Sequence, residues 1–114
     1  MENLDLQEIR DQLDEIDARL VELFEKRMEL CGQVAEFKIG SGKAVYDGQR
    51  EKQKLEAVAA MARSEFSKKG VHELFSQIMT ISRRLQYRLL AEHGRDGDTG
   101  FTMVDELKRE GVRV

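Results

Sequence analysis

The sequence predicts an all-α protein with three helices per chain, the first of them very long, that forms a homodimer. Charged residues make up 36% of the 114 residues and aromatic residues 6%, and the chain contains no proline and no tryptophan. A chain rich in Glu, Lys, Leu, Arg and Gln favours long helices over sheets. Apolar residues also recur at helical spacing in three segments that glycine-rich or polar stretches separate. This length allows one small domain with a thin core.

The first segment, Leu4–Ile39, places its apolar residues on two lines of a seven-residue repeat. This pattern predicts a single amphipathic helix of about ten turns. Gly40-Ser41-Gly42 is expected to end the helix, because glycine readily adopts the left-handed conformation that closes one. No other segment of the chain is long enough to cover its apolar stripe. Burial at roughly 25 cal/mol per Å2 therefore favours pairing between two chains. The stripe consists of Leu6, Ile9, Leu13, Ile16, Leu20, Leu23, Leu30, Val34 and Phe37.

A short loop, Lys43–Tyr46, follows, and Asp47 is a suitable N-cap for a second helix that runs to about Arg63. One side of this helix is expected to carry Leu55, Val58 and Met61. The polar segment Ser64–Gly70 breaks the periodicity, so the third helix is expected over about Val71–Ala91. Its inward residues are expected to be Leu74, Phe75, Ile78, Leu85 and Leu89.

The pattern places the domain at residues 1–91 and a Gly/Asp-rich linker and tail at residues 92–114. The tail is either the connector to a following domain or a native disordered extension. The net charge of −3 gives no support for binding nucleic acid or an anionic membrane. Cys31 is the single cysteine, which excludes an internal disulfide and fits a reducing cytoplasm. The acidic N-terminus lacks the apolar core of a signal peptide, and no apolar run reaches membrane-spanning length. A cytoplasmic protein is expected.

Several polar residues interrupt these apolar faces or lie at the start of the second helix. Each taken alone has an ordinary structural interpretation, as a cation extending to water, a helix cap, a solvated acid or a structural amide. Taken together they predict a buried anionic ligand, because unpaired charges are costly to bury. The residues are Arg10, Arg27, Lys38, Asp47, Arg50, Glu51, Ser82 and Gln86.

Helix geometry limits how these cations can meet one ligand. Arg27 and Lys38 share a face about 16 Å apart along the axis, so their long side chains can grip one small molecule. Arg10 lies about 25 Å from Arg27 on the same helix and cannot reach that molecule from the same chain. If Arg10 binds the ligand, an antiparallel helix of a partner chain must deliver it.

Over roughly residues 5–91 the chain resembles the helical class of chorismate mutase. The resemblance rests on polar positions that match in order and in near-identical spacing: Arg10, LFEKR ending at Arg27, Lys38, VYDGQRE over Val45–Glu51, Ser82 and Gln86. It implies three-helix chains that interlock as dimers, use no cofactor and convert chorismate to prephenate. This reaction is the committed step toward phenylalanine and tyrosine. The family often forms the first domain of a bifunctional protein that continues into prephenate dehydratase.

The resemblance also implies a role for each candidate residue. Arg27 and the Arg10 of the partner chain would grip the substrate carboxylates, and Lys38 and Gln86 would donate to the ether oxygen. Glu51, with the backbone near Asp47, would accept from the ring hydroxyl, while Arg50 and Ser82 complete the polar lining. An intramolecular rearrangement needs no nucleophile and no metal. The enzyme holds the diaxial, near-attack conformer and stabilises charge on the breaking ether bond.

Two other functions stay open from the sequence. An isochorismate-pyruvate lyase of the same fold would use a similar cationic pocket, although the presence of both Asp47 and Glu51 favours the mutase. A helical dimerisation module without an active site would explain the apolar stripe. It would give Arg27 and Gln86 no reason to face inward.

Overall fold

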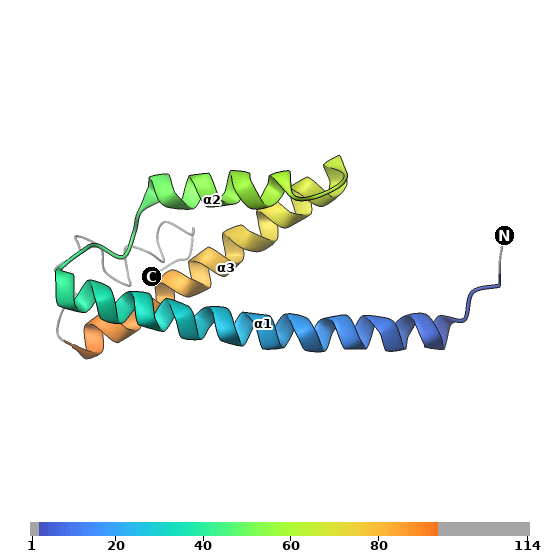
Figure 1. The fold of residues 1–114 in the computed structure, drawn as a ribbon, viewed down its shortest axis with the longest axis horizontal. Helices are drawn as coiled ribbons and strands as arrows, with labels where there is room; N and C mark the ends of the chain where they lie inside the picture. The colour runs from blue at the N-terminus through green and yellow to red at the C-terminus, as the bar shows by residue number, and fades with distance from the viewer. Residues whose placement is uncertain (1–2, 94–114) are drawn as a thin grey trace, which may run out of the picture. The chain divides into compact units, whose positions relative to one another are not determined.

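A computed structural model describes residues 3–93 of the chain. Within this range the protein consists of three α-helices, α1 (Leu6–Ser41), α2 (Gly48–Ala60) and α3 (Glu65–Glu92), and has no strand (Figure 1). The all-helical prediction with a very long first helix is confirmed. The predicted tail, apart from its first two residues, lies outside the described residues.

Both ends of α1 follow from local chemistry. At its start, Asp5 Oδ1 accepts hydrogen bonds from the backbone N–H groups of Gln7 and Glu8, at 3.0 and 3.3 Å. At its end, Gly42 has a φ of 74° and its N–H donates to the Lys38 carbonyl at 2.9 Å. Glycine adopts this left-handed conformation without strain. The predicted glycine stop is therefore confirmed. The last helical residue is Ser41, and Gly42 is the glycine that ends the helix.

The predicted N-cap of α2 is also confirmed. Asp47 has an extended backbone, and its side chain accepts a hydrogen bond from the Arg50 N–H at 3.0 Å. The helix ends at Ala60, earlier than the predicted Arg63. Met61, expected on one side of this helix with Leu55 and Val58, is instead its C-cap and is 77% exposed, whereas Val58 is buried. Its N–H bonds the Val58 carbonyl three residues back, which tightens the last turn and ends the helix.

The start of α3 differs most from the prediction. The helix begins at Glu65, six residues before Val71, because Ser64 caps it by accepting a hydrogen bond from Ser67 N–H at 3.1 Å. The polar segment Ser64–Gly70 is therefore the cap and first turns of a helix and not a break. The turns lack apolar periodicity because most of their residues face water. Leu74, predicted to face inward, is 52% exposed.

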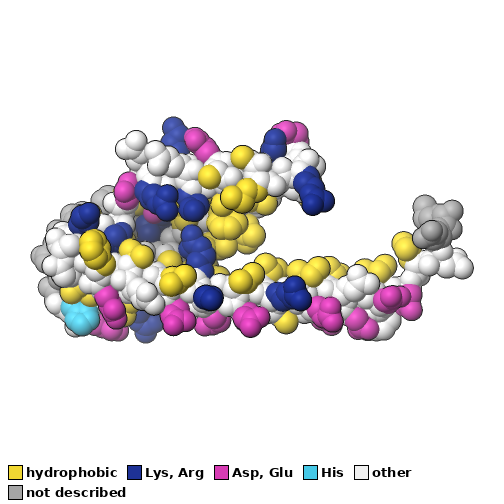
Figure 2. Space-filling model, in the orientation of Figure 1, with side chains coloured by type: hydrophobic (Ala, Val, Ile, Leu, Met, Phe, Trp, Pro, Cys, Tyr) yellow, Lys and Arg dark blue, Asp and Glu magenta, His cyan; other side chains and the backbone are white. Residues whose placement is uncertain are grey.

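The chain divides into two compact units inside α1, between Leu30 and Cys31. The described part of the first unit, residues 3–30, is a helical segment preceded by three residues. Figure 2 shows hydrophobic side chains in a row along one side of α1 and acidic side chains along the opposite side. The row keeps much of its surface exposed, from 38% at Ile9 to 63% at Leu23. Its other exposed members in this unit are Leu6, Leu13, Ile16, Leu20 and Leu30.

The second unit contains the end of α1, the connecting loop, α2 and α3. The two later helices pack against each other. A small apolar cluster joins the end of α1 and the loop to the end of α3; its buried members are Ala35, Val45, Tyr87 and Leu90. None of the helices described is long and apolar enough to cross a membrane.

Candidate active site

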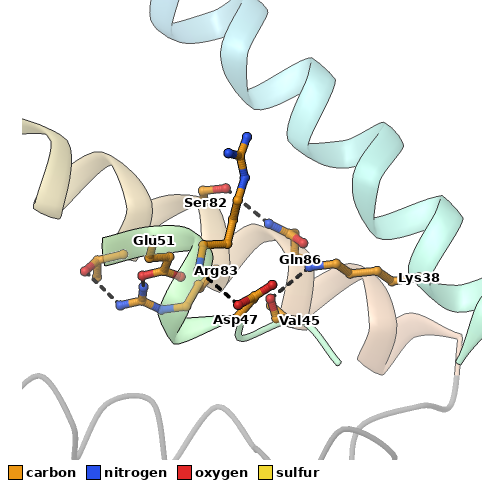
Figure 3. Close-up of polar contacts among 9 residues, drawn as sticks. Lys38, Val45, Asp47, Glu51, Ser82, Arg83 and Gln86 are labelled. Carbon is orange, nitrogen blue, oxygen red and sulfur yellow. Dashed lines mark hydrogen bonds and ion pairs between the residues drawn. The ribbon is translucent and has the colours of Figure 1, made fainter. Parts of the chain in front are cut away.

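Five of the eight predicted site residues gather in the second unit. Figure 3 shows them on three elements, at the end of α1, around the start of α2 and in the second half of α3. They are Lys38, Asp47, Glu51, Ser82 and Gln86. Their grouping from three separate stretches of sequence supports the prediction that these polar residues share one site.

Lys38 lies in the last turn of α1 and is partly buried. Its Nζ donates a hydrogen bond to the Val45 carbonyl at 2.8 Å, which directs the side chain toward the loop before α2 (Figure 3). Desolvation by burial lowers the pKa of Lys38 below 10.5, while the charges of Asp47, Glu51 and Cys31 oppose this shift. The effect of burial on the Lys38 ammonium therefore outweighs that of the acidic groups around it. A bound anionic group beside it would stabilise the charged form.

The two acidic residues of the site have different surroundings. Asp47 is exposed, and one of its carboxylate oxygens caps α2. Glu51 lies one turn into α2, and its side chain is 22% exposed. Glu51 Oε1 accepts a hydrogen bond from Nη1 of Arg83, with which it forms an ion pair (Figure 3). Of the two acids, Glu51 is therefore the one that the surrounding side chains hold in place.

Arg83 is a site residue that the sequence interpretation missed. It is 8% exposed and lies on the buried face of α3. A signal was present, because Arg83 precedes the buried Tyr87 and Leu90 by four and seven residues, which is the spacing of one helix face. An arginine within an amphipathic helix usually extends to water, so the spacing alone did not separate it from neighbouring Arg84.

The predicted inward orientation of Ser82 and Gln86 is confirmed, since they are 6% and 7% exposed. Gln86 Nε2 donates to Ser82 Oγ at 3.2 Å, and Ser82 Oγ donates to Cys31 Sγ at 2.8 Å. The buried Gln86 Oε1 has no hydrogen-bond partner among the described residues. A buried amide with one unsatisfied end costs about 1–3 kcal/mol. Only a ligand group that donates a hydrogen bond would relieve this cost, whereas an acceptor on a ligand could take the second hydrogen of Nε2.

The other three candidates lie apart from this group or contribute differently. Arg50 is exposed, and its backbone N–H bonds the Asp47 cap. Arg10, which is exposed, and Arg27, which is partly buried, both lie on α1 in the first unit. Since the helix between them is continuous, they are about 25 Å apart along its axis. One small ligand cannot touch both within one chain.

Among residues 3–93, no three or more His, Cys, Asp and Glu side chains are arranged to hold a metal ion. The polar groups that gather instead are an ammonium, a guanidinium, carboxylates, an amide and a hydroxyl. This set can bind and orient a polar anion through charge and hydrogen bonds.

The family model of chorismate mutase type II matches residues 9–87 of the chain. The chain belongs to this family. The match extends from the first turns of α1 to Tyr87 on α3 and includes all eight predicted site residues. No match was found among curated proteins or among solved structures.

Membership of the type II chorismate mutase family confirms the resemblance that the polar residues indicated. It supports an isomerase activity of the chorismate mutase type on an all-helical scaffold. The roles of the single residues and the homodimer stay predictions.

Proposed function

We propose that the protein is a chorismate mutase that rearranges chorismate to prephenate in the biosynthesis of phenylalanine and tyrosine in the cytoplasm. The observation that carries this proposal is the gathering of Lys38, Glu51 and Gln86 from three helices, in a chain that belongs to the type II family. A dianionic substrate with an ether bridge and a ring hydroxyl matches a cation, an amide donor and a carboxylate acceptor.

In the proposed mechanism, the enzyme binds the diaxial conformer and favours the charge distribution of the transition state. Lys38 and Gln86 donate hydrogen bonds to the ether oxygen, where negative charge develops as its bond to the ring breaks. Donors that are already in place stabilise this charge without reorganisation. Lys38 is suited to this role because burial has removed part of its hydration.

The remaining residues orient the substrate. Glu51 and the backbone near Asp47 accept from the ring hydroxyl, and Arg50 and Ser82 line the site. Arg27 and the Arg10 of a partner chain bind the two carboxylates. The exposed apolar row on α1 supports the homodimer that this arrangement requires.

The test is an absorbance assay of chorismate depletion with identification of the product. Prephenate without released pyruvate is expected. Pyruvate release from isochorismate, without prephenate from chorismate, would instead indicate the lyase. No turnover of either substrate by the folded protein would favour a dimerisation module.

A matched pair of lysine variants tests the site itself. Lys38→Ala should lower the rate constant by about 10²–10³, the usual cost of removing one donor aimed at developing charge. Lys68→Ala, which removes a half-exposed lysine in the first turns of α3, should retain wild-type activity. Circular dichroism should show an unchanged fold in both. Near-normal turnover by Lys38→Ala would remove this residue from the mechanism.

A further inference from the structure

Arg83 is held on several sides where it meets Glu51. Its Nη1 donates to Glu51 Oε1 (Figure 3), and its Nη2 donates to Thr80 Oγ1 at 3.2 Å. Its guanidinium carbon lies 5.5 Å from the centroid of the Tyr46 ring, within cation–π range. These contacts use the planar fork of the guanidinium, which a lysine cannot reproduce.

Tyr46 packs against the start of α2. A Cβ added to Gly48 would lie 2.8 Å from the Tyr46 hydroxyl oxygen and 3.1 Å from the ring carbon that carries it. The absence of a Cβ at Gly48 therefore lets the tyrosine pack closely on the first turn of α2. Thr80 on α3 and Tyr46 in the loop thus hold Arg83 in one orientation, and Arg83 in turn holds Glu51.

Burial distinguishes this ion pair from the surface pair at the start of α3. The side chains of Arg83 and Glu51 are 10% and 22% exposed, whereas those of the surface pair Lys68 and Glu65 are 44% and 85% exposed. Exposed pairs contribute little to stability, and buried pairs are often no more stabilising than apolar residues of the same size. Stability alone therefore gives a weak reason for placing a buried arginine against Glu51.

We propose that Arg83 is a positioning residue that fixes the Glu51 carboxylate through Oε1, so that Oε2 can accept the ring hydroxyl of the substrate. The inference rests on the proposed chorismate mutase function. A carboxylate has two acceptor oxygens, and a bond to one of them restricts the direction of the other. Arg83 touches no reacting atom in this arrangement. Its effect on the reaction passes through Glu51.

The first test compares the kinetics of variants of the 114-residue chain with chorismate as substrate. Arg83→Met removes the guanidinium but keeps an unbranched side chain, and should lower kcat/KM by about tenfold to a hundredfold, as misplaced binding groups do. Arg88→Met, which removes an exposed arginine of the same helix, is the matched control and should stay within about twofold. Arg83→Lys should recover part of the loss because it restores the charge without the fork.

A double-mutant cycle tests whether Arg83 acts through Glu51. Glu51→Gln should lower kcat/KM, and adding Arg83→Met to it should cost less than about threefold more, because the carboxylate to be positioned is already gone. Independent losses that multiply would contradict the proposal. Thermal unfolding of each variant identifies any that fail to fold. If Arg83→Met does, Arg83→Lys takes its place in the cycle.

The decisive measurement is kcat/KM with an analogue of chorismate in which hydrogen replaces the ring hydroxyl. Arg83→Met and wild type should rearrange this analogue with similar kcat/KM, although they differ on chorismate. A merely structural arginine would slow both substrates equally, and that result would overturn the inference. If the wild type is active and Arg83→Met has the same kcat/KM as Arg88→Met, the inference about Arg83 is overturned. The proposed function then stays intact. A wild type without mutase activity would overturn the proposed function first.

Discussion

At the scale of single residues, Lys38 connects burial to activity. Its pKa is lowered by desolvation, so the free enzyme should lose the Lys38 proton, and with it kcat/KM, at a pH below the ordinary 10.5 of lysine. The Glu51 carboxylate raises this pKa, so Glu51→Gln should move the alkaline limb of the profile to still lower pH. The measurement is kcat/KM against pH.

The control for this shift is Glu56→Gln, which removes the same charge from an exposed position on α2. Its alkaline limb should coincide with that of wild type. Coincident limbs for Glu51→Gln and wild type would mean that Glu51 does not act on Lys38.

Gln86 provides a second test, because its proposed role requires a hydrogen to donate. An amide donates at any pH, whereas a carboxyl group donates only when protonated. Gln86→Glu should therefore be poor near neutral pH and gain activity as the pH falls, while wild type stays nearly flat. The experiment is a pH profile of kcat/KM with folding checked at each pH. A variant profile parallel to that of wild type would leave Gln86 as a structural amide.

The sequence was informative about site residues whose polarity conflicts with their position. Ser82 and Gln86 interrupt an apolar stretch of α3, and the structure buries both. Arg83 was missed because sequence does not distinguish an arginine that extends to water from one that a carboxylate holds inside. The partner, Glu51, lies on another helix, and only the packing of α2 on α3 brings the two together.

At the scale of helices, boundaries were predictable where a side chain caps the helix or a glycine adopts a positive φ. Asp47 and Gly42 were correctly placed for this reason. The start of α3 was not, because the prediction relied on apolar periodicity, and an exposed first turn has none. Ser64 carried the relevant signal, as a serine whose hydroxyl can cap the residue three positions on.

The placement of Gly70 inside α3 leads to a stability prediction. A Cβ added there meets no atom within 4 Å, and the backbone does not adopt a positive φ. Gly70→Ala should therefore stabilise the protein by about 0.4–1 kcal/mol, because alanine loses less backbone entropy on forming a helix. Gly42→Ala, at a φ of 74°, should destabilise it. Urea unfolding measures both, and destabilisation by Gly70→Ala would contradict its helical place.

At the scale of the whole molecule, the exposed apolar row and the spacing of two arginines both predict a homodimer. Arg10 and Arg27 are about 25 Å apart on one continuous helix, too far to bind one small dianion together. Two antiparallel copies of α1 would bring the Arg10 of one chain to the Arg27 of the other and would cover the exposed leucines. The proposed site is therefore complete only in the dimer, where each chain supplies one of the two arginines.

Mixing two inactive variants tests this sharing directly. Arg10→Ala and Arg27→Ala should each be nearly inactive alone, because every site of either homodimer lacks one arginine. A heterodimer has one intact site and one site that lacks both, so it should recover about half the activity of the wild-type dimer. The variants are unfolded and refolded together, and differently tagged chains allow the heterodimer to be purified and counted. An inactive heterodimer would mean that Arg10 acts within its own chain or outside the site, since chains that share no residues cannot complement each other.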